Sequence, residues 1–151
     1  MPYKVPVSAL VLVHTRDLEV LLIERADYSD YWQSITGSQE PGETLAETAT
    51  RELYEETGIV AANYGGVVDW QVSNVYEIYP QWRYRYPPGT THNTEHVFSI
   101  EVPITVAVTL APKEHGRHQW VPWRDAAARC FSWTNRDAIL LLPGRAGTRN
   151  V

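Results

Sequence analysis

The stretch from Gly37 to Ile59, GSQEPGETLAETATRELYEETGI, constrains the fold of this chain more than any other segment. Six carboxylates stand there against a single cation, Arg51. A helix surface usually interleaves the two signs, because like charges four residues apart repel. The acidic residues are Glu40, Glu43, Glu47, Glu52, Glu55 and Glu56. Such a concentration of acid is expected where a multivalent cation binds.

The same stretch carries the start and stop signals of a helix. Residues 44–47, TLAE, have the form of a capping box, in which threonine and glutamate satisfy backbone N–H groups at a helix start. Gly58 is a typical helix end, because glycine accepts the left-handed conformation found there. At about 100° per residue, the expected apolar stripe consists of Leu45, Ala46, Ala49 and Leu53.

Three of the acidic residues share the side of the helix that should be buried. Glu56 falls inside the apolar stripe, Glu52 at its edge and Glu55 just beyond it. A solvated acidic face is the usual interpretation of a Glu-rich helix, but it does not explain acid on the buried side. A carboxylate there is costly unless it is paired or binds a metal. We therefore predict a metal site on this helix.

The segment resembles the signature of the Nudix hydrolases. That signature is Gly, five residues, Glu, seven residues, then Arg-Glu-aliphatic-x-Glu-Glu-x-Gly-aliphatic. The residues at its fixed positions here are Gly37, Glu43, Arg51, Glu52, Leu53, Glu55, Glu56, Gly58 and Ile59. The chain has Ser38 where many members carry a second glycine. The resemblance implies an α/β (α+β) fold, an α/β/α sandwich with a mixed sheet, and hydrolysis of phosphoanhydride bonds.

The flanking sequence is similar to one branch of that family, the bacterial pyrophosphohydrolases of dihydroneopterin triphosphate in folate synthesis. The similarity runs from about Lys4 to about Leu142, and it depends on the order and spacing of short pieces. These are YWQSITGS at 31–38, RYRYPPG at 83–89, HNTE at 92–95, KEH at 113–115 and SWTNR at 132–136. The resemblance implies release of pyrophosphate from dihydroneopterin triphosphate, leaving the monophosphate.

The expected catalytic groups are carboxylates that hold metal ions. Hard oxygen donors suit Mg²⁺, with Mn²⁺ as a substitute. Glu52 and Glu56 lie one helical turn apart and can clamp one ion, and Glu55 beside them can hold a second. By resemblance, Glu114 is the expected general base or a further metal ligand, although an ordinary loop glutamate is an equal alternative; Glu55 is the alternative base. Arg51 is expected to orient a carboxylate rather than to touch the substrate.

A triphosphate substrate needs cations, and a flat pterin ring needs aromatic faces and hydrogen-bonding groups. Lys4 and Arg25 are the expected phosphate contacts. Arg83 and Arg85 are further candidates, although a solvated surface position explains each of them as well. The resemblance adds substrate contacts at Thr36, Tyr76, Glu77, Ile78, Tyr79 and Ser132.

The composition fits a small enzyme. We expect one Nudix domain over residues 1–151, with residues 143–151 as a frayed tail. The formal net charge of −5 argues against a nucleic-acid or membrane-surface partner, so a small-molecule pterin or nucleoside triphosphate is the expected partner. One cysteine, no signal-like apolar run and no long apolar stretch favour the cytoplasm. The oligomeric state is not specified by the sequence.

Two other functions compete with the pterin hypothesis. The residues of the Nudix signature are expected to contact only the phosphate chain of a substrate, so they do not specify the rest of it. Hydrolysis of oxidised dNTPs or of dinucleoside polyphosphates is therefore an alternative. A non-catalytic domain that senses a nucleotide is a weaker alternative, because the carboxylates of the signature are all present.

Outside the signature, alternation and turn residues predict the remaining elements. Strands are expected at 5–14, 20–24, 95–102 and 118–121, and two more within 67–86, broken near Pro80. Helices are expected at 123–129 and from Thr134 to Leu142, the last one ended by Pro143 and Gly144.

Overall fold

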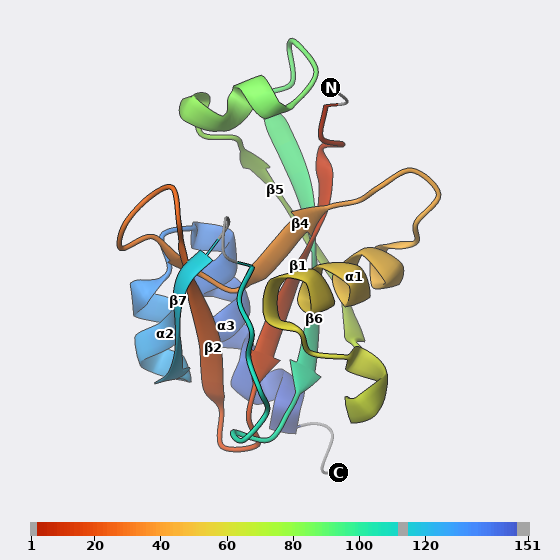
Figure 1. Cartoon of the computed structure of the whole chain (residues 1–151). Coiled ribbons are helices and arrows are strands. Elements are labelled where there is room, and N and C mark those ends of the chain that lie inside the picture. Colours follow the sequence, from red (N-terminus) through yellow and green to blue (C-terminus); the bar gives the residue numbers. More distant parts are fainter. Residues whose placement is uncertain (1–2, 112–114, 148–151) are drawn as a thin grey trace.

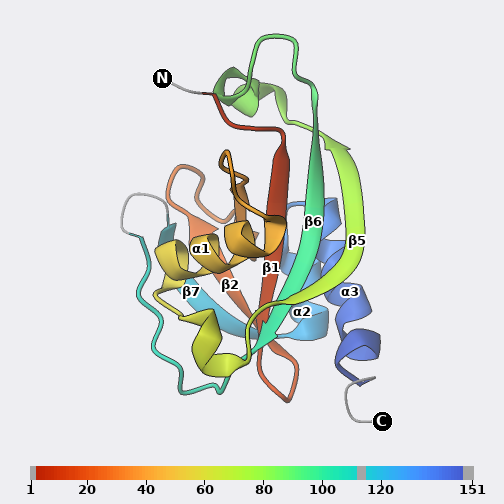
Figure 2. The same ribbon diagram turned by 90° about the vertical axis from the view of Figure 1, so that its right-hand side faces the viewer.

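A mixed β-sheet lies between one helix on one face and two helices on the other (Figures 1 and 2). The computed structural model describes residues 3–111 and 115–147. The strands are β1 (Val7–His14), β2 (Glu19–Arg25), β3 (Trp32–Gln33), β4 (Ile35–Ser38), β5 (Val68–Glu77), β6 (His92–Glu101) and β7 (His115–Pro122). The helices are α1 (Leu45–Thr57), α2 (Trp123–Arg129) and α3 (Trp133–Gly147), with 3₁₀ helices η1 (Ala61–Tyr64) and η2 (Pro80–Arg85).

The sheet follows the order β3-β2-β1-β6-β5, with β4 paired to β1 and β7 paired to β2. β1 and β6 run parallel, and the other pairs are antiparallel. The predicted mixed sheet between helices is confirmed.

The neighbouring strands β1 and β2 separate along most of their length. They pair at His14 and Val20, next to the turn that joins them. Further along, β4 takes the place of β2 beside residues Ser8–Val11 of β1, while β3 stays paired with β2. The sheet is therefore open at the end where β1 begins and β2 finishes, and that opening leads into the pocket described below.

Each face of the sheet has its own apolar core. Ala49 and Leu53 of α1 pack with Val11 and Phe98 on one face. Ala138 and Ile139 of α3, with Ala126 of α2, pack with Leu10, Leu12 and Val97 on the other. Alternate residues of β1 and β6 thus enter opposite layers, as the two-residue period of a strand requires.

Helix α1 forms where the sequence predicts it. The backbone N–H of Glu47 donates to Thr44 Oγ1 over 3.1 Å, and the backbone N–H of Thr44 donates to Glu47 Oε1 over 2.8 Å. Gly58 ends the helix with φ 76°. The expected stripe is wrong at Ala46, which is exposed, because the buried side turns toward Thr48.

Two predictions about element ends are wrong. Within residues 67–86 there is one strand, β5, and it is followed by η2 in place of a second strand. Pro80 fits the first turn of a helix, because a backbone N–H has no intrahelical partner there and proline lacks that group. α3 continues through Pro143 to Gly147. Tertiary contacts hold this last turn, because Arg145 donates to the carbonyl of Trp70 over 3.1 Å and lies over its ring.

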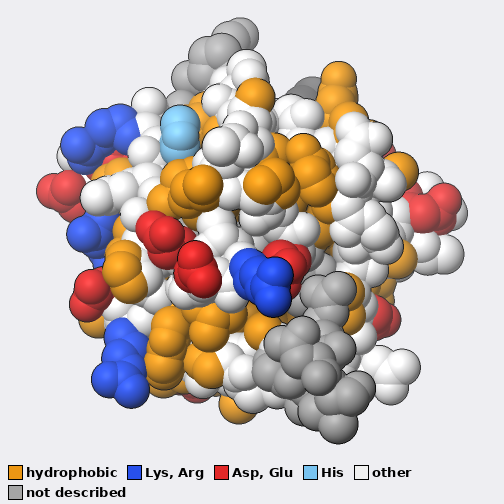
Figure 3. All heavy atoms as spheres, turned by 90° about the horizontal axis from the view of Figure 1, so that it is seen from below, with side chains coloured by type: hydrophobic (Ala, Val, Ile, Leu, Met, Phe, Trp, Pro, Cys, Tyr) orange, Lys and Arg blue, Asp and Glu red, His pale blue; other side chains and the backbone are white. Residues whose placement is uncertain are grey.

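No helix within residues 3–111 and 115–147 is long and apolar enough to cross a membrane. On the face seen in Figure 3, at the end of the molecule opposite η2, acidic and basic side chains are interspersed with apolar ones.

Candidate active site

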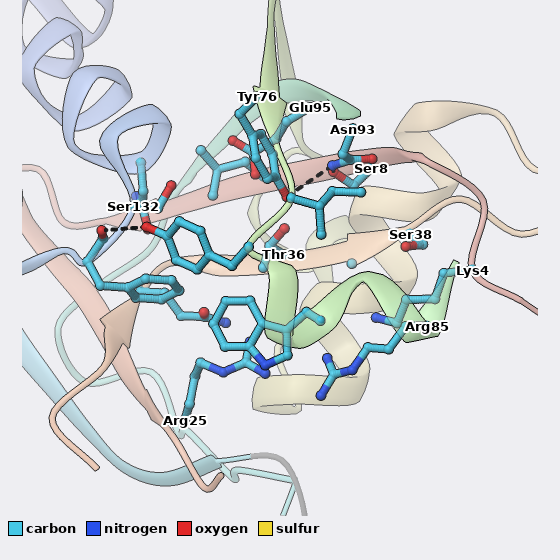
Figure 4. A pocket seen from close by; sticks show the side chains of 18 of the residues that line it. Lys4, Ser8, Arg25, Thr36, Ser38, Tyr76, Arg85, Asn93, Glu95 and Ser132 are labelled. Carbon is cyan, nitrogen blue, oxygen red and sulfur yellow. Dashed lines mark hydrogen bonds between the residues drawn. The ribbon is translucent and has the colours of Figure 1, made fainter. Parts of the chain in front are cut away.

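A pocket of about 510 Å³ occupies the open end of the sheet. Its walls come from the segment before β1, from β1, β2, β3, β4, α1, β5, η2 and β6, and from the start of α3. Figure 4 shows Tyr76, Glu95, Asn93 and Ser8 grouped at one end, with Lys4 and Arg85 together on another side. Residues far apart in the sequence therefore face one cavity.

Helix α1 supplies an acidic wall. Glu52, Glu55 and Glu56 all line the pocket. Glu56 is 3% exposed, as its predicted place inside the apolar stripe requires. Gly37 of β4 lies against Glu52 so closely that a Cβ there would overlap the carboxyl group. The glycine of the signature thus lets the carboxylate of Glu52 approach the backbone of β4.

Arg51 holds the acidic wall from behind. Its guanidinium donates to Glu43 over 2.6 Å, to Glu52 over 2.7 Å and to the carbonyl of Ser38 over 3.0 Å. It also contacts Glu55 at 3.3 Å. Arg51 does not line the pocket, so its position agrees with the predicted orienting role.

The surroundings shift the pKa values of Glu43 and Glu52 in opposite directions. Hydrogen bonding from Arg51 lowers the pKa of Glu43 to about 2, so Glu43 stays ionised and keeps the guanidinium in place. Burial, with the nearby charge of Glu56, raises the pKa of Glu52 to about 7 despite the hydrogen bond from Arg51. Negative charge at Glu52 and Glu56 is therefore unfavourable without a cation.

The donor chemistry fits a hard divalent ion. Two carboxylates that disfavour each other's charge line the pocket, and Mg²⁺ and Mn²⁺ prefer such oxygen donors. As their side chains lie, the described residues include no group of three or more His, Cys, Asp or Glu that could hold an ion. Glu114, the predicted base or further ligand, lies outside the described residues.

A second wall is aromatic. Tyr79, Trp82 and Phe131 line the pocket, and the rings of Tyr79 and Trp82 stack with centroids 5.3 Å apart. The guanidinium of Arg25 lies 4.5 Å from the centre of the Trp82 ring. This wall comes from η2 and the residue before it, and from the residues before α3, and it offers a flat apolar surface.

Three cations, Lys4, Arg25 and Arg85, line the same pocket. Asp27 balances part of their charge, because it accepts from Arg25 over 2.8 Å and lies 3.5 Å from Arg85. The backbone N–H of Lys4 donates to the carbonyl of Arg85, which ties the segment before β1 to η2. Arg83, also a candidate, bonds instead to the carbonyl of Ile78 and does not line the pocket.

The remaining end of the pocket is polar and buried. Asn93 Nδ2 donates to Ser8 Oγ over 2.8 Å and to the Tyr76 hydroxyl over 3.1 Å (Figure 4). Glu95 is 4% exposed, and its carboxyl group accepts from Thr134. Burial raises the pKa of Glu95 to about 7.

The pocket brings together most of the residues that the sequence nominates. Those lining it are Lys4, Arg25, Thr36, Glu52, Glu55, Glu56, Tyr76, Glu77, Ile78, Tyr79 and Ser132. Their roles remain predictions. Sequence reasoning assigned no role to several other lining residues, among them Ser8, Asp27, Trp82, Asn93, Glu95 and Phe131. The HNTE piece at 92–95 contributes to the family resemblance, but only the folded structure shows that Asn93 and Glu95 are its pocket-lining residues.

Residues 4–142 match the family model of the NUDIX domain. The chain therefore belongs to the Nudix family. Hydrolases of this family generally need a divalent metal ion, in agreement with the acidic wall.

Two relatives and one solved structure narrow the comparison. Over 139 residues, 91% of each chain, the sequence is 42% identical to dihydroneopterin triphosphate diphosphatase of Escherichia coli K12. It is 39% identical to the Haemophilus influenzae protein of that name, over 92% of this chain and 88% of the relative. The structure of the Escherichia coli dihydroneopterin triphosphate pyrophosphohydrolase superposes with a TM-score of 0.86 at 40% identity, covering 92% of this chain and 95% of that one.

Proposed function

We propose that this protein hydrolyses dihydroneopterin triphosphate to dihydroneopterin monophosphate and pyrophosphate, using Mg²⁺, as a step in folate synthesis. The observation that carries the proposal is one pocket that is lined by the acidic wall at Glu52, Glu55 and Glu56, by cations and by the aromatic wall. The relatives that bear this name cover nearly the whole chain, and the family match over residues 4–142 supports one Nudix domain.

The two walls divide the substrate between them. Lys4, Arg25 and Arg85 offset the charge of the phosphates, which the net charge of −5 would otherwise repel. The aromatic wall offers Tyr79 and Trp82 to a flat ring. A pterin triphosphate has both parts, so it uses the length of the pocket from the cations to the buried polar end.

In the proposed mechanism, Glu52 and Glu56 hold Mg²⁺, which when bound neutralises phosphate oxygens and lowers the pKa of a water. Arg51 fixes the carboxylate of Glu52 through the 2.7 Å hydrogen bond and keeps the adjacent Glu55 within 3.3 Å. A general base takes the proton of the attacking water. Glu114 is the proposed base and Glu55 the alternative.

Initial rates of pyrophosphate release test the proposal directly. Dihydroneopterin triphosphate is compared with a dNTP panel, including oxidised dNTPs, and with a dinucleoside polyphosphate, in Mg²⁺, in Mn²⁺ and in EDTA. We expect the pterin substrate to give the highest kcat/KM, and EDTA to abolish turnover. A higher kcat/KM for any nucleotide would replace the pterin assignment, and full turnover in exhaustively chelated enzyme would contradict the metal mechanism.

A further inference from the structure

Two residues at the polar end of the pocket carry buried acceptor atoms that have no hydrogen-bond partner in the described part of the chain. Glu95 Oε1 and Asn93 Oδ1 have no hydrogen bond within the described residues, although Glu95 is 4% exposed and Asn93 1% exposed. Both residues line the pocket. Buried polar atoms are nearly always satisfied in native proteins, so two such acceptors at one place indicate a ligand that donates to them.

The hydrogen bonds made by neighbouring side chains determine which atoms of Asn93 and Glu95 remain as acceptors. Both N–H groups of the Asn93 amide are used, one by Ser8 Oγ and one by the Tyr76 hydroxyl, so its oxygen is the part of the side chain that is left for a further hydrogen bond. Thr134 donates to the carboxyl group of Glu95, which leaves Oε1 for another donor. The two residues lie two apart on β6, so their side chains leave the same face of the sheet.

An acceptor pair of this kind matches a ring N–H beside an exocyclic amino group, an edge that pterins share with guanine. A pterin carries a ring N–H next to an exocyclic amino group, and a carboxylate accepts from both at once as it does from a guanidinium. Adenine lacks this ring N–H, and an oxo group in place of the amino group removes one donor. The burial raises the energetic cost of leaving either acceptor unsatisfied.

We propose that Glu95 is a specificity-determining residue, accepting hydrogen bonds from the N–H and amino groups of the pterin ring, with Asn93 Oδ1 as a second acceptor beside it. This inference rests on the proposed function, because it orients the pterin toward the buried end of the pocket. The triphosphate then extends toward Lys4 and the glutamates of α1.

A structural role for Glu95 is the competing explanation. Its bond to Thr134 joins β6 to the first turn of α3, so loss of the carboxylate could disturb that helix start. The two explanations differ in what they predict for ligands. A structural defect weakens every ligand that occupies the site, whereas a lost acceptor weakens only those that present the N–H and amino pair.

Measurements of ligand binding in the absence of metal distinguish the structural role of Glu95 from the specificity role, and they do not depend on hydrolysis. The probes are 6-hydroxymethylpterin and 6-hydroxymethyllumazine, which differ at position 2 by an amino or an oxo group; both are titrated by calorimetry. We expect wild-type protein to bind the pterin at least about tenfold more tightly. Glu95→Gln should lose at least about tenfold on the pterin and under about threefold on the lumazine. Glu101→Gln, at the exposed end of the same strand, is the matched control and should match wild type.

Each outcome decides the inference. Equal weakening of both probes in Glu95→Gln, or unchanged pterin binding, overturns it. Equal affinity of wild-type protein for the two probes also overturns it, and that measurement needs no variant to fold. A wild-type protein that binds the pterin selectively through Glu95 but does not hydrolyse dihydroneopterin triphosphate would refute the proposed function and leave this inference standing.

Discussion

The position of Arg51 leads to a strong prediction for Arg51→Lys, which keeps the charge but loses the fork of donors. The guanidinium bonds Glu43 at 2.6 Å, Glu52 at 2.7 Å and the Ser38 carbonyl at 3.0 Å. Hydrogen bonds to charged groups contribute about 1.5–3 kcal/mol each. A lysine ammonium can keep roughly one of the two carboxylate contacts.

Loss of the other contact and of the carbonyl bond gives about 3–6 kcal/mol. The side chain of Arg51 is 22% exposed, so solvent screens part of this free energy, and we expect a destabilisation below that range, about 2 kcal/mol. For a chain of this size that corresponds to a fall of about 4–8 °C in the thermal midpoint. Because the carboxylate of Glu52 loses its anchor, kcat should fall by about 10–100-fold.

Urea unfolding and steady-state release of pyrophosphate measure the two effects. Arg136→Lys is the control, because the guanidinium of Arg136 is exposed and bonds to its neighbour Asp137 on the same helix. It should change stability by under about 0.5 kcal/mol. An Arg51→Lys enzyme within that limit, and within about twofold of wild-type kcat, would refute the anchoring role.

Four further outcomes are expected. Glu56→Gln removes a negative charge from the acidic wall and should lower kcat by at least about 100-fold with an unchanged circular dichroism spectrum; near-wild-type turnover at saturating Mg²⁺ would contradict the ligand role. Glu114→Ala should lower kcat about 10²–10⁴-fold with little change in KM if Glu114 is the base; an unimpaired enzyme passes that role to Glu55. Gly37→Ala should displace Glu52 and reduce kcat, whereas Gly144→Ala, with open space around it, should not. Because the pKa of Glu95 is raised from 4.5 to about 7 in the folded state, its stabilising contribution is complete below about pH 4.5 and is lost as the pH rises through 7. Thermal midpoints between about pH 5 and pH 8 should therefore fall less for Glu95→Gln than for wild type; equal slopes would contradict the shift.

The acidic wall was predictable because its information is local in the sequence. Thr44 and Gly58 mark the ends of α1, and helical spacing then places Glu56 on the buried side. The predicted apolar stripe is wrong at its edge, at Ala46, because tertiary packing sets the final rotation of the helix about its axis. The family signature adds Gly37, whose closeness to Glu52 depends on a strand too short to show alternation.

The opposite end of the pocket could not be derived in the same way. Glu95 faces the pocket because β6 pairs with β1 in a particular register, Ser8 beside Glu95, and because α3 begins next to it. Those contacts join residues far apart in the chain, and no local pattern encodes them. For η2 the local pattern itself misleads, because the alternating aromatic residues Tyr84 and Tyr86 suggest a strand, whereas Pro80 begins a 3₁₀ helix.

The distribution of the pocket residues over separate elements has a consequence for how such enzymes diversify. Glu52 and Glu56 belong to helix α1, whereas Tyr76, Asn93 and Glu95 belong to strands β5 and β6. Under the roles proposed above, substitutions among the second set would change which heterocycle is bound and would leave the residues proposed to act on the phosphates in place. A lineage can therefore inherit its chemistry intact while its choice of metabolite changes by a few mutations on a separate wall.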